Sequence, residues 1–303
     1  GDGARGNSKP VVAVLLGGAD GPLAPGSSVP AFTFPEQAAA VLGRSHAYAR
    51  WLREEAVIGA DTVRPVDPQA AHEIIGAAID APHGATVGLD LTTARKLLGT
   101  YGLVMAEAVE ATPDTAIAAA ERIGFPVAVK AVRRRPGRSA RAGVALDLTD
   151  GDDISDSIGV MSESLGDDAG ELVVQAMTSP GVDVRIRCEH DDRLGAIVTV
   201  GLGGAQADAI DDRSNRLAPV SPASATSMVR ETRLASALDA AGLDSWQLVD
   251  AIVLAAQLAS DHPQIAELDL NPVIVSQDGA VITDAIIRLT EHVDEDGPLR
   301  RLD

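Results

Sequence analysis

Oxygen-bearing side chains gather near the C-terminus, in the stretch of residues 266–285, which reads AELDLNPVIVSQDGAVITDA. Polar residues alternate there with leucines, and this period of two predicts a strand with one apolar and one polar face. Glu267, Asp269 and Asn271 share the polar face. The strand therefore brings amide and carboxylate oxygens to one side of a sheet.

A second strand is expected to fold back onto the first, because Asp278-Gly279 lies between two β-rich runs and is typical of a hairpin loop. With this loop, Gln277 pairs with Ala280. Asp284 then lies diagonal to Asn271 on the same face, about 7–8 Å away. An amide oxygen and a carboxylate facing one point suit Mg²⁺, which shares its shell with phosphate oxygens. A hairpin whose polar face only meets water remains the alternative.

One lysine interrupts an apolar run. Residues 127–132, VAVKAV, predict a strand that carries Lys130 among apolar neighbours, and the chain has only two other lysines, Lys9 and Lys96. A buried ammonium group is costly unless an anion meets it. The alternative is an edge lysine whose head reaches water.

Two loops have the composition of phosphate-binding segments. Five arginines fall within residues 133–141, between two predicted strands, and suit a cover over a polyphosphate. Gly201-Leu202-Gly203-Gly204 follows an antiparallel meander expected over residues 172–200, and such glycines let the backbone approach a phosphate. The alternative for the arginine segment is a solvated charge run, and the alternative for the glycine segment is an ordinary loop.

Composition narrows the class of protein. The chain has 303 residues, 46% of them hydrophobic, and a formal net charge of −19, which argues against nucleic acid as a partner. No apolar run approaches the roughly 20 residues of a membrane span, so we expect a cytoplasmic protein without a membrane partner. The single Cys188 excludes an internal disulfide framework and a cysteine-rich zinc site.

Four segments are expected. Residues 1–58 predict two strands and a helix from Pro35 to about Glu55, a piece too small to cover both faces of a sheet and so the end of an α/β domain. Proline-rich residues 59–88 predict a linker with one short helix. Residues 89–291 predict the main unit of alternating helices and strands, and residues 292–303 a loose tail.

Six motifs in this order resemble the ATP-grasp module of the NDP-forming acyl-CoA synthetases, of the ADP-forming acetate–CoA ligase type, which are relatives of succinyl-CoA synthetase β subunits. The motifs are LLGTYG (97–102), AAAERIGFPVAVKAV (118–132), LVVQAM (172–177), GLGG (201–204), RLAP (216–219) and ELDLNPVIV (267–275) with Asp284-Ala285. The resemblance implies an α+β class, an ATP-grasp fold of two α+β lobes. Residues 1–58 would be a fragment of the preceding flavodoxin-like, succinyl-CoA-ligase-like α/β domain.

The resemblance also implies ligands and roles. ATP would lie between the lobes, with Lys130 at its phosphates and Mg²⁺ held by Asn271 and Asp284. The other residues assigned to the nucleotide are Arg138, Gln175, Gly203, Gly204, Asp208 and Arg216.

The chain departs from the family pattern at two motifs. Relatives carry a loop resembling HKSDVGGV, whose histidine is a phosphoryl carrier, whereas residues 137–144 here read GRSARAGV, with Arg138 in place of a lysine and no histidine. Where relatives read VQEM, this chain has Val174-Gln175-Ala176-Met177.

Two functions follow as hypotheses. In the first, the chain is the nucleotide-binding part of a ligase that converts an acyl acid, CoA and ATP to acyl-CoA, ADP and phosphate, with a CoA-binding domain as its partner. In the second, it is a catalytically inactive regulatory ligand-binding module that resembles those fused to GNAT-type protein lysine acetyltransferases.

Overall fold

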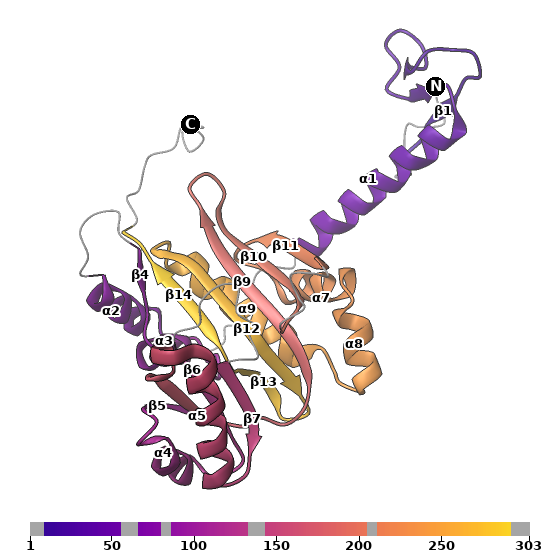
Figure 1. Cartoon of the computed structure of the whole chain (residues 1–303). Coiled ribbons are helices and arrows are strands. Elements are labelled where there is room, and N and C mark those ends of the chain that lie inside the picture. The colour runs from indigo at the N-terminus through magenta and orange to yellow at the C-terminus, as the bar shows by residue number, and fades with distance from the viewer. Residues whose placement is uncertain (1–8, 56–65, 80–85, 133–142, 205–210, 292–303) are drawn as a thin grey trace. The chain divides into compact units, whose positions relative to one another are not determined.

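The structure is a computed structural model, and it describes residues 9–55, 66–79, 86–132, 143–204 and 211–291, without the side chains of residues 51–55. The chain divides into two compact units, Gly1–Thr62 and Val63–Asp303, each described below by itself (Figure 1). Among the described residues, no helix has the length and apolar character needed to cross a membrane.

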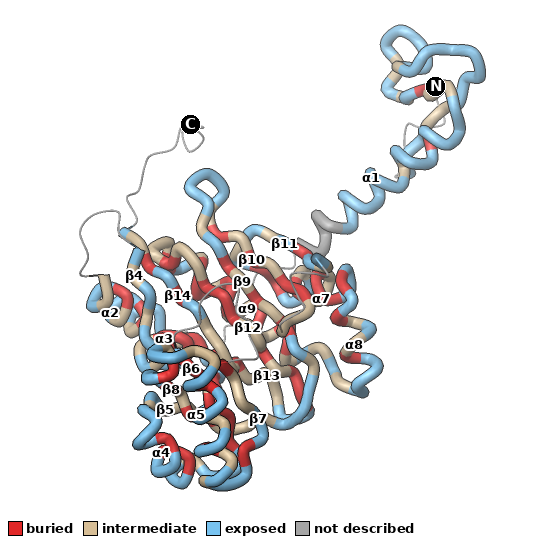
Figure 2. Tube along the Cα trace, viewed as in Figure 1, coloured by how far each residue is buried: buried red, intermediate tan, exposed pale blue. Residues whose placement is uncertain are grey.

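Unit 1 holds three short strands and one long helix. Strand β1 (Ala13–Val14) pairs in parallel with β3 (Pro30–Phe32), and β2 (Gly21–Pro22) pairs with β3 in antiparallel fashion. Helix α1 (Pro35–Glu55) starts on a proline, as predicted, because proline fixes a helical φ where no N–H partner is needed. Most large apolar side chains of this unit are exposed (Figure 2).

The larger sheet of unit 2 has seven strands, with the order β11-β10-β9-β12-β14-β4 and with β13 paired to β12. The strands are β4 (Val87–Gly88), β9 (Val182–Asp191), β10 (Gly195–Leu202), β11 (Arg213–Leu217), β12 (Ile265–Ser276), β13 (Gly279–Ile282) and β14 (Ala285–Leu289). Neighbours along this path pair in antiparallel fashion. The antiparallel meander expected over residues 172–200 is confirmed for β9 and β10 but was wrong for residues 172–176, which form a strand of another sheet.

Helices α7 (Pro222–Glu231), α8 (Leu234–Ala241) and α9 (Trp246–Asp261) cover one face of this sheet. Alternate residues of β9, β10 and β12 point to these helices and are buried, among them Ile186, Val198 and Leu268. The intervening residues form the opposite face, which is rich in arginine, aspartate and glutamate, and we call it the polar face. A sheet with one apolar and one polar face follows from the period-2 patterns of the sequence.

The N-terminal part of unit 2 packs into the same core. Helix α2 (Pro68–Ala78) lies within residues 59–88, the predicted linker, and buries Ala71 and Ile75 against the core. Helix α3 (Leu91–Thr100) buries Leu97 and Leu98 there. The predicted domain limits remain predictions, but this helix is a packed part of unit 2.

A second, smaller lobe spans residues 108–176. Its four-stranded sheet has the order β5-β8-β6-β7, and two helices pack on it around a separate hydrophobic core. The elements are β5 (Ala108–Ala111), α4 (Ala116–Ile123), β6 (Val127–Ala131), β7 (Val144–Leu148), α5 (Gly151–Leu165), a 3₁₀ turn (Gly166–Ala169) and β8 (Leu172–Ala176). The expectation of two α+β lobes is therefore confirmed.

Backbone hydrogen bonds attach the segment that leads into the small lobe to the large sheet. Ile282, at the end of β13, donates its N–H to the carbonyl of Val104 at 2.8 Å and accepts the N–H of Ala106 at 2.9 Å. Residues 104–106 lead directly into β5, so the entry to the small lobe is bonded to the hairpin that carries Asp284.

The hairpin register differs from the predicted one. Ser276 pairs with Gly279 and Val275 with Ala280, so the loop is Gln277-Asp278 rather than Asp278-Gly279. The prediction that Gln277 pairs with Ala280 was wrong by two positions. Gly279 has a φ of +133°, which glycine tolerates, and it ends the loop instead of lying within it.

Two buried residues, Tyr101 and His262, and the exposed Asp261 connect the end of α3 to the end of α9. The Tyr101 hydroxyl donates to Asp261 Oδ2 at 2.6 Å and lies 3.2 Å from His262 Nε2. Burial raises the pKa of Tyr101, and so does its bond to Asp261, so the hydroxyl stays a donor. Burial lowers the pKa of His262, against the attraction of Asp261, so the imidazole is neutral at pH 7.

This cluster predicts a pH dependence of stability. Because the folded pKa of His262 is below the unfolded value of about 6.5, the unfolded chain binds the extra proton first as pH falls. Stability that is fully present above pH 6.5 is therefore lost below it. We expect His262→Gln to lose less stability between pH 7 and pH 5.5 than the parent chain, by at most about 1.4 kcal/mol per pH unit. Urea denaturation at each pH measures this, and equal slopes would contradict it.

Candidate functional site

Asn271 and Asp284 face each other at the break between β13 and β14. On either side of them, Val273 pairs with Ile282 and Leu270 with Ala285, and the Asn271 N–H donates to the Asp284 carbonyl at 3.1 Å. The two residues are thus directly opposite, whereas the sequence predicted a diagonal relation. The shift by two positions keeps both on one face, because side chains alternate with a period of two.

A β-bulge gives Asn271 its position. Leu270 pairs with Ile186 and Val273 with Val184, so residues 271 and 272 together add one extra residue opposite β9. Bulges bend a strand and redirect a side chain. The Asn271 side chain accepts the N–H of Gly204 through Oδ1 at 2.9 Å, which also fixes its amide oxygen toward the glycine loop.

Lys130 reaches the same hairpin from the small lobe. Its Nζ donates to the carbonyl oxygen of Thr283 at 2.7 Å, and Gln175 Nε2 donates to the same oxygen at 3.0 Å. Gln175 is buried, and β8 places it beside Ala128, two residues before the lysine. The structure therefore brings Lys130 and Gln175 to the residue next to Asp284.

The glycine loop is pressed against β9. A Cβ on Gly203 would lie 2.6 Å from the backbone carbon of Val184, and the Gly203 N–H donates to the Asp183 carbonyl at 2.8 Å. Gly204 has a φ of +78°, in the left-handed region that favours glycine. These two glycines hold the loop where its backbone N–H meets Asn271.

Asp183 lies beside this loop and was not singled out from the sequence. A Cβ on Gly204 would come 2.9 Å from Asp183 Oδ2. Loss of surrounding water raises the pKa of this carboxyl. The alternation of residues 182–188, VDVRIRC, was the available signal, because it places Asp183 on the same face as Arg185 and Arg187.

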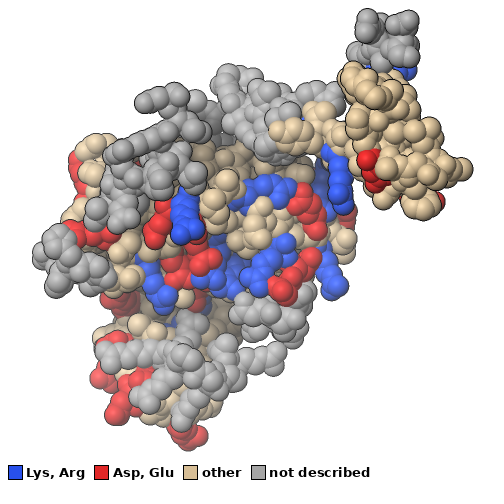
Figure 3. All heavy atoms as spheres, turned by 90° about the horizontal axis from the view of Figure 1, so that it is seen from above, with Lys and Arg blue, Asp and Glu red and all other residues tan. Residues whose placement is uncertain are grey.

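Ion pairs cover the polar face next to Asn271. Arg185 binds Asp269 through two hydrogen bonds, of 2.9 and 2.6 Å, and the Asp269 side chain is only 9% exposed. Arg187 binds Glu267 at 3.0 Å, and Glu267 also accepts from Arg288 of β14 at 2.7 Å. Figure 3 shows basic and acidic side chains interspersed on one face of the molecule.

Arg216 lies apart from these residues. Arg216 binds Glu231 of α7 at 2.5 Å and Ser214, and it projects toward the helices rather than onto the polar face. The structure does not bring it together with Lys130 or Asn271, and its contact with a nucleotide remains a prediction. Arg138 and Asp208 lie outside the described residues.

The donor set fits a hard cation. Asn271 and Asp284 offer an amide and a carboxylate oxygen, and Asp183 adds a carboxylate on the other side of the glycine loop. Oxygen ligands with no thiolate or imidazole suit Mg²⁺ or Ca²⁺ rather than zinc. In the described part of the chain, no three histidine, cysteine, aspartate or glutamate side chains form a metal-binding group, so such a cation would need ligands from water or phosphate as well.

The match to a family model identifies the family to which the chain belongs. Residues 80–289 match the family described as the ATP-grasp domain. The chain belongs to the ATP-grasp family. This confirms the expected fold, since the matched residues contain both lobes and every described residue of the site.

Relatives of this ATP-grasp chain are acyl-CoA ligases. It is 29% identical over 282 residues to acetate–CoA ligase [ADP-forming] I of Archaeoglobus fulgidus, covering 88% of this chain and 40% of the ligase. It is 30% identical over 210 residues to acetate–CoA ligase [ADP-forming] II subunit beta of Pyrococcus furiosus, covering 65% of this chain and 89% of that subunit. The chain thus spans about two fifths of the single-chain relative and most of the separate β subunit.

A solved structure of an acetyl-coenzyme A synthetase has a similar fold. Acetyl-coenzyme A synthetase 1 of Ca. Korarchaeum cryptofilum, in complex with coenzyme A and Ca-AMPCP, matches with a TM-score of 0.59 and 29% identity, over 67% of this chain and 93% of that one. Another structure of this synthetase holds coenzyme A and Mg-AMPPCP and matches with a TM-score of 0.56 and 28% identity.

The close packing of the glycine loop predicts that a methyl group added at Gly203 lowers the free energy of unfolding. Gly203→Ala should destabilise the chain by about 2 kcal/mol, because backbone atoms of β9 occupy the space a Cβ needs. Gly159→Ala in α5 is the control, since nothing lies within 4 Å of its Cβ position, and it should be neutral or stabilise by up to about 1 kcal/mol. Urea denaturation compares them, and equal free energies of unfolding would refute the close approach.

Proposed function

We propose that this ATP-grasp chain binds a magnesium–nucleotide where Lys130 meets the hairpin of Asn271 and Asp284. The observation that carries the proposal is the hydrogen bond of 2.7 Å from Lys130 Nζ to the carbonyl of Thr283. This bond joins a cationic head from the small lobe to the residue beside a candidate metal ligand. A cation and oxygen donors at one junction suit a polyphosphate bridged by a metal ion.

Each group has a separate task in this proposal. Lys130 neutralises charge on the phosphates, and Gln175, which shares its acceptor, holds the lysine head in place. Asn271 and Asp284 would hold Mg²⁺, which when bound supplies further positive charge to the transferring phosphoryl group. Gly204 donates its N–H to Asn271, and Gly203 lets the loop approach β9 closely. The nucleotide complexes of the Korarchaeum synthetase support this assignment.

The reaction we propose for the whole protein is that of an ADP-forming acyl-CoA synthetase. The curated relatives are acetate–CoA ligases, and the β-subunit relative is matched over 89% of its length. This chain would supply nucleotide binding, and a CoA-binding domain would supply the other half of the site. Because residues 137–144 contain no histidine, a phosphoryl group would not travel through that loop.

The same missing histidine favours a second candidate function. A chain that retains the lysine and the oxygen donors but lacks the carrier would bind nucleotide without turnover. It would then act as a regulatory module, for example beside a GNAT-type acetyltransferase domain. Turnover separates the two candidates.

Nucleotide binding should depend on the two sides of the junction. Lys130→Ala should weaken Mg-ATP binding by roughly 10- to 100-fold in calorimetry, because a charge-assisted hydrogen bond is lost. The matched control is Lys96→Ala, which removes an exposed lysine of α3 and should change nothing. Asp284→Asn should abolish the gain in affinity that Mg²⁺ gives, and Mn²⁺ resonance spectra in the presence of ATP provide a second readout.

A thermal denaturation curve for each variant shows whether it is folded at the titration temperature. If Lys130→Ala and Asp284→Asn both bind Mg-ATP as tightly as the control Lys96→Ala, the nucleotide site is not at this junction.

Turnover should require both cosubstrates if the ligase function holds. With its CoA-binding domain present, the protein should release ADP from ATP only when an acyl acid and CoA are both added. Removal of either reactant gives the control. Saturable Mg-ATP binding without ADP release over a broad panel of acids would support the regulatory function instead.

A further inference from the structure

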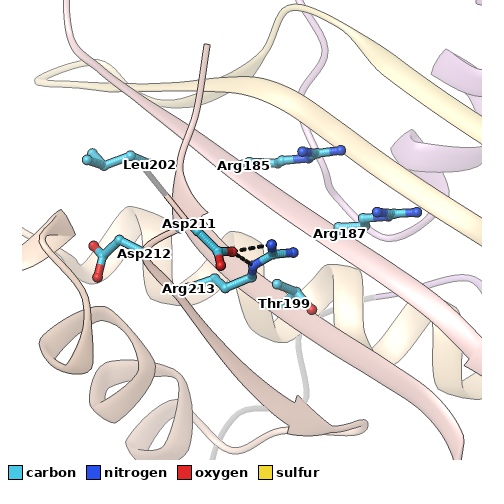
Figure 4. Close-up of a pocket in the computed structure, with 8 residues that line it drawn as sticks. Arg185, Arg187, Thr199, Leu202, Asp211, Asp212 and Arg213 are labelled. Carbon is cyan, nitrogen blue, oxygen red and sulfur yellow. Dashed lines mark hydrogen bonds and ion pairs between the residues drawn. The ribbon is translucent and has the colours of Figure 1, made fainter. Parts of the chain in front are cut away.

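A small pocket on the polar face is lined by three arginines that the nucleotide proposal does not use. Arg185 and Arg187 come from β9 and Arg213 from β11, and the wall is completed by Thr199, Gly201, Leu202, Asp211 and Asp212 (Figure 4). The cavity volume is about 40 Å³, larger than the roughly 10–15 Å³ that one water molecule requires. It therefore suits one compact group of a few oxygen atoms.

Carboxylates hold the three guanidinium groups in position. Arg185 is paired with Asp269, Arg187 with both Glu189 and Glu267, and Arg213 with Asp211, whose Oδ1 accepts from Arg213 Nε. In Figure 4, Arg185 and Arg187 extend next to each other from β9, as residues two apart on a strand must. A guanidinium has five N–H groups, and one carboxylate accepts two, so such pairing orients an arginine without exhausting it.

One donor in this wall lacks an acceptor. Arg187 Nε is buried and has no hydrogen-bond partner among the described residues. Buried polar groups are normally paired, so this atom marks a place where an acceptor belongs. A Cβ on Gly201 would lie 2.5 Å from the Asp212 carbonyl oxygen, so backbone atoms meet closely at this part of the pocket.

The charge around this pocket is mixed. The chain carries a formal net charge of −19, so an anion is repelled by the molecule as a whole. Three arginines and two aspartates, Asp211 and Asp212, line the cavity, and arginine is the residue whose planar fork matches carboxylate and phosphate oxygens. Lys130, Asn271 and Asp284 are not in the pocket wall.

We propose that the arginine pocket, defined by Arg185, Arg187 and Arg213, binds a small oxyanion, a carboxylate or a phosphoryl group, at a site separate from that of the nucleotide. The pocket opens on the same face as Asn271, since Arg185 binds Asp269, two residues before it. An oxyanion held there lies next to the proposed metal–nucleotide site without sharing its ligands.

The test titrates the whole chain with inorganic phosphate and, separately, with acetate, by calorimetry and by NMR of the arginine Nε–H groups. Saturable binding of at least one is expected, and the one that binds identifies the group as phosphoryl or carboxylate. Arg213→Gln should weaken that binding roughly tenfold, the effect of one charge-assisted contact.

Arg288→Gln is the matched control. Arg288 and Arg213 have side chains that are 55% and 54% exposed, each is paired with a carboxylate, and only Arg213 lines the pocket. The control should bind the anion as the parent chain does.

Three results overturn the proposal, whatever the nucleotide titrations show. The first is that neither anion binds saturably. The second is that Arg288→Gln weakens anion binding as much as Arg213→Gln does. The third is that Lys130→Ala weakens anion binding and Arg213→Gln does not, which assigns the anion to the nucleotide site instead. Thermal denaturation of each variant verifies that it is folded.

Discussion

The carbonyl oxygen of Thr283 is the point on which the arrangement of the two lobes depends. It accepts from Lys130 and from Gln175, which come from neighbouring strands of the small sheet, and it belongs to the hairpin of the large sheet. Backbone bonds from Ile282 to residues 104 and 106 lie immediately beside it. A charged donor and a buried amide on one carbonyl give a directional contact, so the lysine head is fixed relative to the hairpin.

The break between β13 and β14 makes this contact possible. A continuous strand would bond its carbonyls to a neighbouring strand, whereas the Thr283 carbonyl bonds to side chains from the small lobe instead. Opposite the break, the bulge in β12 turns Asn271 toward the glycine loop. The strand break leaves a backbone carbonyl that is not bonded to a neighbouring strand, and the bulge redirects a side chain. A regular β-ladder provides neither.

The charged side chains on the polar face are held in defined positions by ion pairs. Asp269 and Glu267 orient arginines of β9, and Glu267 also binds Arg288. Arg216, on the opposite face, is paired with a helix residue instead. In a chain with a large negative charge, such pairing keeps cationic side chains at defined places, where they balance the field of the acidic surface.

The sequence alone determined the elements, the family and the chemical character of the site. Apolar patterns placed β6 and α1 within a residue or two of their observed ends, and the ordered motifs indicated the ATP-grasp fold. The sequence did not reveal β11, because its five residues, RSNRL, are mostly polar and resemble a loop.

Tertiary structure alone decided the hairpin register, the partner of Arg216 and the place of Asp183. Loops at residues 277–278 and 278–279 leave the alternating pattern intact, and a shift by two pairs keeps every side chain on its face, so periodicity does not distinguish between them. The contact of Lys130 with Thr283 joins residues 153 positions apart. No local pattern encodes such a contact, since it forms only when both lobes have folded and the chain between them has brought their edges together.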